Sequence, residues 1–239
     1  ALLEPEVYAI LQDAGLDTPR HVFWAGEPGT ALPAEVRAFL ESTPGDRVVL
    51  KIVSPQILHK TEVGGLAFPE REPGAVLAAA RRIWEETGRR SPGAERRGLL
   101  VSERVPAASG SIASETLLSL KQDPAFGPIL VLGLGGVLTE WYGALSGGAS
   151  TLVLQPGAVR PALELAAQTM PAFSLLFRPS RLHAVPPLDL ERTIERLEAL
   201  GRLAEEWGRA AAFPFTLEEL EVNPMLLTTD GRWVAVDGV

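Results

Sequence analysis

The segment at residues 50–65, LKIVSPQILHKTEVGG, brings together side chains that can handle phosphate. Lys51 lies in an aliphatic run in which both faces of a strand would be apolar, so we expect this strand to be buried on both sides. A lysine in such a strand needs an anion near its ammonium, or it lies at a sheet edge with the ammonium in solvent. The pattern leaves these two interpretations open.

The loop that follows this strand carries His59, Lys60, Gly64 and Gly65. An imidazole near phosphate can donate a hydrogen bond, act as a base or accept a phosphoryl group, whereas most loop histidines are simply solvated. Adjacent glycines let backbone amides approach a ligand, or they merely form a turn. With Lys51 nearby, the combination favours a loop that covers phosphate, although the chain has no GxxxxGK[ST] Walker pattern.

A second group of polar residues lies near the C-terminus, in the sequence ELEVNP. Glu221 and Asn223 share one face of the expected strand, and the turn sequence TTDG predicts a β-hairpin. In one hairpin register Asn223 lies opposite Asp237, which would gather side-chain oxygens of the kind that Mg²⁺ prefers. The alternative is a polar hairpin face in water. We favour the metal because Pro224 is expected to end the strand pairing beside these residues.

Composition excludes several classes of protein. The chain has 239 residues, no cysteine and a net charge of −8. The absence of cysteine excludes disulfides, thiolate catalysis and cysteine-bound zinc, and the acidic charge argues against nucleic acid as the main partner. The longest apolar run, at residues 127–138, is shorter than the roughly 18 residues of a membrane span, and no signal-peptide pattern is visible. We therefore expect a cytoplasmic protein that binds neither nucleic acid nor a membrane.

Periodicity and turn signals predict a mixture of helices and strands, and hence an α+β fold. Helices are expected at residues 3–15, 33–42, 73–88 (ending at Gly88), 160–170 and 189–210 (with Asp189 as N-cap). Strands are expected at residues 21–24, 46–53, 98–105, 114–120, 128–134 and 151–156, and in the C-terminal hairpin. The stretch PAASGS predicts a joint between two subdomains, at residues 1–105 and 106–239.

Three segments, in this order, resemble the ATP-grasp domain of the NDP-forming acyl-CoA synthetases, the relatives of succinyl-CoA synthetase beta chains that include ADP-forming acetate–CoA ligases. The segments are LKIVSPQILHKTEVGG, ETLLSLKQDPAFGPILVLGLGG, and LEVNP with the terminal AVD. The resemblance covers nearly the whole chain and implies an ATP-grasp fold, in which two α+β subdomains grip ATP. It also implies a reversible reaction in which an acid, CoA and ATP give acyl-CoA, ADP and phosphate through an acyl phosphate and a phosphohistidine.

The same resemblance implies a role for each matching residue of the first subdomain. His59 would carry the phosphoryl group, and Lys51 would contact the ATP phosphates. Lys60, Gly64 and Gly65 would belong to the loop around the phosphates.

Other matching residues would bind the nucleoside and the metal. Glu103 and the backbone around Val105 would line the adenine and ribose pocket, and Glu115 would hold a nucleotide hydroxyl. The residues that would bind Mg²⁺ are Asn223, Asp237 and Glu221. A Rossmann-type CoA-binding portion is absent from the sequence, so CoA and a small carboxylic acid are expected to enter through a partner subunit or a fused domain.

Some positions depart from the family pattern. Ser119 stands where glycine is usual, Ala144 replaces a common aspartate, and residues 147–156 lack a usual arginine. These departures support a second hypothesis, a degenerate ATP-grasp module of a larger protein such as a protein acetyltransferase, whereas the retained Lys51 and His59 favour the active synthetase. A third hypothesis, an ATP-grasp ligase that joins a carboxylate to an amine, is disfavoured by the His-Lys loop.

Overall fold

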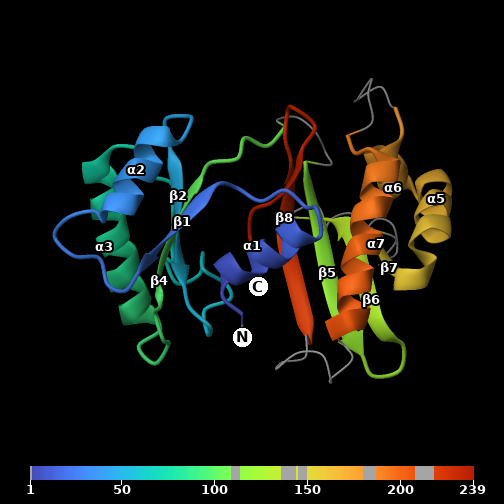
Figure 1. Ribbon diagram of the computed structural model, residues 1–239, viewed down its shortest axis with the longest axis horizontal. Helices are drawn as coiled ribbons and strands as arrows, with labels where there is room; N and C mark the ends of the chain where they lie inside the picture. Colours follow the sequence, from blue (N-terminus) through green and yellow to red (C-terminus); the bar gives the residue numbers. More distant parts are fainter. Residues whose placement is uncertain (1, 109–113, 136–143, 145–149, 180–186, 208–217) are drawn as a thin grey trace. The chain divides into compact units, whose positions relative to one another are not determined.

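The computed structural model describes residues 2–108, 114–135, 144, 150–179, 187–207 and 218–239 (Figure 1). The chain divides into two compact units. The first contains Ala1–Val7 and Pro19–Arg104, and the second contains Tyr8–Thr18 and Val105–Val239. Helix α1 (Glu4–Asp13) therefore begins in the first unit and continues in the second.

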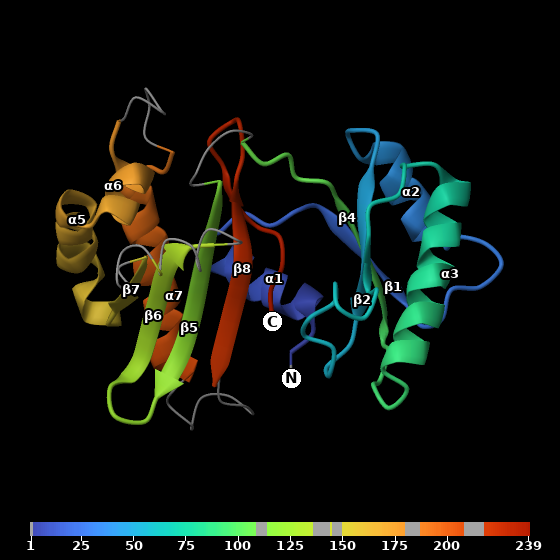
Figure 2. The ribbon, with the colours of Figure 1, turned by 180° about the vertical axis from the view of Figure 1, so that it is seen from behind.

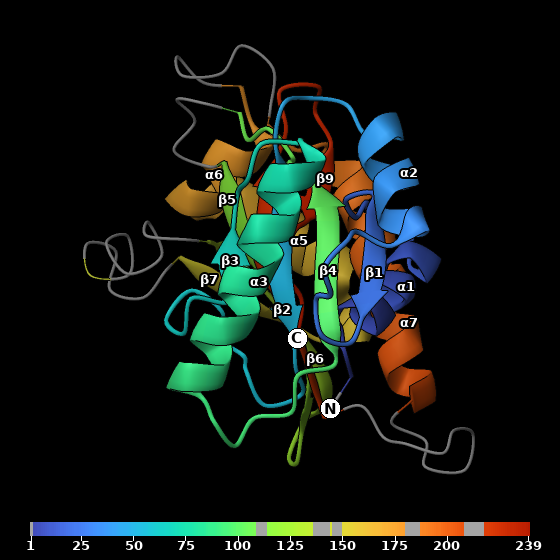
Figure 3. The same cartoon turned by 90° about the vertical axis from the view of Figure 1, so that its left-hand side faces the viewer.

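The first unit is built on an antiparallel four-stranded sheet with the order β1-β4-β2-β3. Its strands are β1 (His21–Ala25), β2 (Val48–Val53), β3 (Leu66–Ala67) and β4 (Gly98–Glu103). Helices α2 (Ala34–Ser42) and α3 (Pro73–Arg90) cover one face of this sheet (Figures 2 and 3).

Alternation along β2 decides what each face of this sheet carries. Val48, Leu50 and Ile52 point into the hydrophobic core shared with α2 and α3. Val49, Lys51 and Val53 point to the opposite face, yet every residue of β2 is buried. The expectation that this strand is buried on both sides is confirmed.

The expected end of the third helix at Gly88 is wrong, because α3 continues to Arg90. A Cβ atom on Gly88 would lie 2.6 Å from Nη1 of Arg96. The Arg96 guanidinium lies over the ring of Trp84, 4.5 Å from its centroid, and donates a hydrogen bond to the Trp84 carbonyl. Gly88 therefore lies inside the helix, where it makes room for the Arg96 side chain from the segment that follows, and it does not end the helix.

The second unit contains an antiparallel five-stranded sheet with the order β7-β6-β5-β8-β9. The strands are β5 (Glu115–Asp123), β6 (Gly127–Leu134), β7 (Thr151–Leu154), β8 (Glu219–Leu227) and β9 (Trp233–Ala235). A short 3₁₀ helix, η1 (Pro156–Ala158), precedes α5 (Val159–Thr169), α6 (Pro171–Phe177) and α7 (Leu190–Trp207). These three α-helices lie on one side of the sheet (Figures 1 and 2).

Helix α7 begins where the sequence predicts. The Asp189 carboxylate accepts a hydrogen bond of 2.8 Å from the Arg192 amide, as an N-cap does. The predicted helix extends to residue 210, and residues 208–210 lie outside the described residues. Among the described elements, the sequence does not predict β3, the short 3₁₀ helix η1 or α6.

The two sheets with their helices confirm the α+β class. Within the described ranges, no helix combines the length and the apolar character that crossing a bilayer requires.

Candidate active site

Lys51 lies on an interior strand and not at a sheet edge. It pairs with Leu66 of β3 on one side and with Leu100 of β4 on the other. The residue is 4% exposed, and its Nζ lies 2.5 Å from Oε1 of Glu4. The interpretation as an edge lysine in solvent is therefore wrong, and a carboxylate of the protein supplies an anion near the ammonium.

Glu4 also meets a second lysine. Its Oε2 lies 3.3 Å from Nζ of Lys60, which is 6% exposed, and Glu4 itself is 5% exposed. The first residue of α1 thus contacts ammonium groups from β2 and from the loop after it, all within the first unit. Sequence analysis missed Glu4. The signal was the buried lysine itself, which needs an anion, but periodicity cannot choose among the acidic residues of the chain.

The loop between β2 and the glycine pair is anchored at its start. Oγ of Ser54 accepts hydrogen bonds of 3.2 Å from the amides of Gln56 and Ile57. Ile57 is 5% exposed, whereas Leu58 is 54% exposed and His59 is exposed. His59 therefore projects from a loop that is held by a buried residue on each side, Ile57 and Lys60.

The glycine pair turns the chain back onto β2. Gly64 has a φ of 72°, a conformation that favours glycine. The Gly65 amide donates to the carbonyl of Lys60 at 2.7 Å, and the Gly65 carbonyl accepts from the Ile52 amide at 2.8 Å. A Cβ atom on Gly65 would lie 2.5 Å from Cγ2 of Ile52, so a side chain does not fit here. In this structure both glycines serve the turn, and their contact with a nucleotide stays a prediction.

The residues expected to bind the nucleoside fall in different units. Glu103 ends β4 in the first unit, where its Oε1 accepts a 3.1 Å hydrogen bond from the Arg20 amide. Val105, buried, and Glu115, the half-buried first residue of β5, belong to the second unit. Their nucleoside contacts stay predictions.

The register of the C-terminal hairpin is the one predicted. Met225 pairs with Ala235, and in the same register the Asn223 amide donates to the Asp237 carbonyl at 3.1 Å. Asn223 and Asp237 are therefore cross-strand neighbours whose side chains share a face. Glu221, two residues before Asn223, lies on that face as well.

The expectation that Pro224 ends the pairing is wrong. The pairing runs past it to the end of the chain, where Glu221 and Val239 exchange both backbone hydrogen bonds at 2.9 Å. Toward β5 the register shifts between Thr116 and Leu118, so the proline lies at a β-bulge, where its missing N–H is tolerated.

This hairpin face fits a metal that arrives with a nucleotide. Among the described residues, no group of three or more His, Cys, Asp or Glu side chains could hold a metal ion. Mg²⁺ needs no such cage, since it is usually held by one or two protein carboxylates together with substrate phosphates and water. Asn223 and Asp237 can supply the protein ligands of such a site, since this cross-strand pair offers an amide oxygen and a carboxylate. Glu221 lies beside them.

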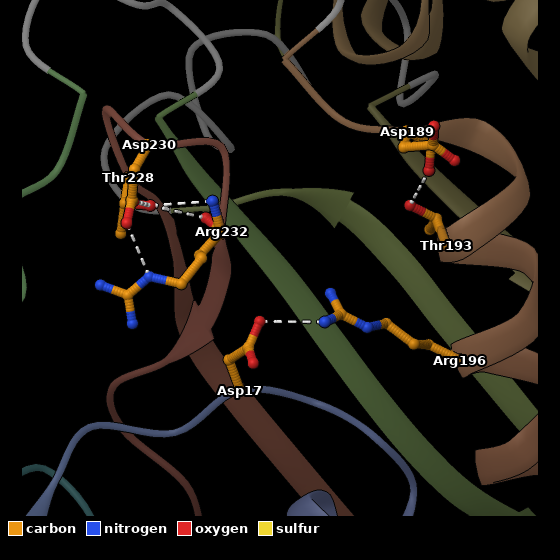
Figure 4. A network of polar contacts seen from close by, with 7 residues as sticks. All are labelled: Asp17, Asp189, Thr193, Arg196, Thr228, Asp230 and Arg232. Atoms are coloured by element: carbon orange, nitrogen blue, oxygen red, sulfur yellow. Dashed lines mark hydrogen bonds and ion pairs between the residues drawn. The ribbon is translucent and has the colours of Figure 1, made fainter.

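Polar contacts fix this hairpin within the second unit (Figure 4). Oδ2 of Asp17 lies 2.9 Å from Nη2 of Arg196 on α7, and the Asp17 carbonyl accepts from the Ala235 amide at 2.8 Å. At the hairpin turn, a hydrogen bond from Thr228 is the main cause of a lowered pKa of Asp230, and Arg232 adds to it. The strand that leads to Asp237 is therefore tied both to a helix and to a charged turn.

The departures from the family pattern lie on the second unit. Ser119 is a buried residue of β5, paired with Val131 and Glu221, so the position where glycine is usual is part of the sheet. Residues 147–149 lie outside the described residues, and Ala144 stands alone between two undescribed stretches.

Comparison with known proteins identifies the family. The family described as the ATP-grasp domain matches residues 1–239. The beta subunit of ADP-forming acetate–CoA ligase I from Pyrococcus furiosus is 27% identical over 236 residues, which are 99% of this chain and 89% of that subunit. ADP-forming 4-hydroxybutyrate–CoA ligase from Nitrosopumilus maritimus is 26% identical over 97% of this chain, but the match spans only 29% of that protein.

Solved structures agree in fold. Dinucleotide-forming acetyl-coenzyme A synthetase 1 of Candidatus Korarchaeum cryptofilum, in complex with coenzyme A, Ca-AMPCP and HgCl⁺, has a TM-score of 0.74 and 28% identity, covering 99% of this chain and 91% of that one. The same enzyme with a phosphorylated phosphohistidine segment has a TM-score of 0.68 over the same shares. The resemblance and the fold expected from the sequence are confirmed: this chain belongs to the ATP-grasp family, and it is similar over nearly its whole length to the beta subunit of an ADP-forming acetate–CoA ligase.

Proposed function

We propose that the chain is the nucleotide-binding, phosphoryl-transferring ATP-grasp part of an ADP-forming acyl-CoA synthetase. Its reaction converts an acid, CoA and ATP to acyl-CoA, ADP and phosphate. The observation that carries this proposal is Lys51, a buried lysine on an interior strand, held next to a loop that presents His59 to solvent. The similarity to the P. furiosus beta subunit supports the same function.

His59 carries the phosphoryl group in this proposal. A neutral ring nitrogen attacks the γ-phosphorus of ATP, a nitrogen–phosphorus bond forms, and the bond to the bridging oxygen breaks, leaving its electron pair on ADP. The imidazole then loses the proton of its other nitrogen to solvent, which leaves a neutral ring. The ammonium groups of Lys51 and Lys60 stabilise the charge that shifts onto the phosphate oxygens.

The protein share of the metal site comes from the C-terminal hairpin. Asn223 and Asp237 hold Mg²⁺, with Glu221 beside them, and the ion neutralises phosphate charge when bound. The K. cryptofilum enzyme has been solved with Ca-AMPCP and with Mg-AMPPCP, which supports a divalent cation with the nucleotide. For the nucleoside, Glu103 and the backbone at Val105 line the adenine and ribose, and Glu115 accepts from a nucleotide hydroxyl.

The acid and CoA reach the reaction through another part of the enzyme. This chain matches 89% of a separate beta subunit but only 29% of the N. maritimus protein. A CoA-binding partner, of Rossmann type, is therefore proposed either as a subunit or as a fused domain. The ATP-grasp subdomains are proposed at residues 1–105 and 106–239, with the reaction in the cytoplasm.

Calorimetric titration with ATP and Mg²⁺ tests the nucleotide role. Replacing Lys51 by Ala should weaken ATP binding about tenfold or more, because a charge-assisted contact to phosphate is lost. The matched control is Lys121→Ala on β5, whose side chain is 51% exposed and lies 3.8 Å from Glu219. It should leave the affinity unchanged.

Two results of this titration would refute the proposal. If wild type and Lys51→Ala bind ATP equally, Lys51 has no phosphate role. If the wild-type chain binds no nucleotide, the degenerate-module hypothesis replaces the active synthetase.

A further inference from the structure

A single buried carboxylate in the first unit contacts two lysines that belong to different elements. Oε1 of Glu4 lies 2.5 Å from the ammonium of Lys51 on β2, and Oε2 lies 3.3 Å from the ammonium of Lys60 in the loop. All three side chains are at most 6% exposed. The attraction between these buried charges is stronger than between charges in solvent, because water does not screen it, and removing one partner would leave a buried charge uncompensated.

The position of Lys60 gives this contact a consequence for its neighbour. Lys60 directly follows His59 in the sequence, and its carbonyl closes the turn by accepting from the Gly65 amide at 2.7 Å. The side chain and the carbonyl of one residue therefore fix the loop on the C-terminal side of the histidine. On the N-terminal side, Ile57 is buried and hydrogen-bonded to Ser54.

We propose that Glu4 is a positioning residue for the phosphoryl-carrier loop: by holding Lys60 next to Lys51, it fixes the point from which His59 projects. This inference rests on the proposed function of His59. Between the two fixed points only Leu58 and His59 remain exposed, so the contact with Glu4 holds the loop in the orientation that this structure shows. Without Glu4, Lys60 is no longer held beside Lys51, and the orientation of the His59 imidazole toward the γ-phosphorus is no longer fixed.

Amide hydrogen exchange measured by NMR on the ligand-free chain tests the fixed point independently of any reaction. In Glu4→Gln, exchange of the Gly65 amide should be about tenfold faster or more, because a charge-assisted contact that supports the turn is lost. The matched control is Glu6→Gln, in the same turn of α1, where the exposed carboxylate accepts from the Leu3 amide. It should leave the Gly65 amide protected as in wild type.

A second variant shows whether Glu4 acts through Lys60. Lys60→Met should accelerate exchange of the Gly65 amide as Glu4→Gln does, and the double variant should add nothing further. This variant also decides the question if Glu4→Gln fails to fold. Unchanged protection of Gly65 in both single variants, or fully additive effects in the double variant, would overturn the proposal.

Phosphorylation of His59 from labelled ATP, in the full enzyme with its partner, tests whether Glu4 positions His59 for phosphoryl transfer. The rate should fall about tenfold or more in Glu4→Gln and stay at the wild-type value in Glu6→Gln. An unchanged rate in Glu4→Gln would show that the fixed point does not position His59. No label at His59 in wild type would instead refute the carrier role itself, and the exchange data would still decide whether Glu4 holds the loop.

Discussion

Replacing Asp17 by Ala should destabilise the second unit, because it leaves the Arg196 guanidinium buried without its carboxylate. The two side chains lie 2.9 Å apart and are 34% and 9% exposed, respectively. Removing one partner of a fully buried pair costs about 3–5 kcal/mol. Water already reaches part of the Asp17 side chain, so we expect the loss to lie below that range, at about 2 kcal/mol.

The matched variant is Arg196→Met, which keeps an unbranched side chain of similar length and removes the buried charge. The remaining carboxylate of Asp17 can be hydrated, so the cost should be no more than about 1 kcal/mol. At about 2–4 °C per kcal/mol, Asp17→Ala should lower the melting temperature by about 4–8 °C, and Arg196→Met by clearly less. Thermal unfolding followed by circular dichroism measures both. An equal decrease in melting temperature in both variants, or a larger decrease in Arg196→Met, would refute the inference that a buried unpaired guanidinium costs more than a partly hydrated carboxylate.

Two further predictions concern the C-terminal hairpin. In Thr228→Val, the pKa of the Asp230 carboxyl should rise toward its ordinary value, because its main hydrogen-bond donor is lost; NMR titration measures this. An unshifted pKa of Asp230 in the variant would contradict the role of Thr228. Since the folded pKa is lowered, the stability that this carboxylate contributes is present above its unfolded pKa and is lost as the pH falls through the folded pKa. In Asp237→Asn, nucleotide binding should need an about tenfold higher Mg²⁺ concentration, because a carboxylate ligand of the metal is lost, and an unchanged dependence would end the assignment of a metal ligand.

The hairpin shows what local pattern can predict. Alternation along ELEVNP and the TTDG turn allow a register that places Asn223 opposite Asp237, because a hairpin with a short turn has few possible registers, and the structure has this register. The same reasoning failed at Pro224. The backbone N–H that a proline lacks would point toward only one of the two neighbouring strands. Here a β-bulge against β5 tolerates the missing hydrogen bond, and the pairing with the C-terminal segment continues.

The partner of Lys51 shows where local pattern stops. Apolar residues on both sides of the lysine correctly indicate a buried strand, and burial requires an anion. The anion is Glu4, far away in the sequence, and nothing in the first turn of α1 marks it over the neighbouring Glu6. Non-local charge pairs of this kind are set by the packing of elements, and the spacing of residues within one element does not record them.

Glycine is ambiguous for a related reason. Gly88 fits the pattern of a helix end, yet it lies inside α3 because the Arg96 side chain needs its space. Gly64 fits the turn that the sequence suggests, since it has a positive φ. The sequence shows that a side chain is missing, but only the packed structure shows whether the backbone or a neighbouring side chain requires the gap.

The most direct test of the phosphoryl-transfer proposal is the site of the label after the enzyme, with its CoA-binding partner, has reacted with γ-labelled ATP. Mass spectrometry under non-acidic conditions, which preserve phosphohistidine, should place the phosphoryl group on His59. In His59→Asn, both the label and the overall synthesis of acyl-CoA should be lost. Label absent from His59 in the working enzyme, or full turnover in His59→Asn, would contradict the carrier role and leave the loop as a phosphate cover only.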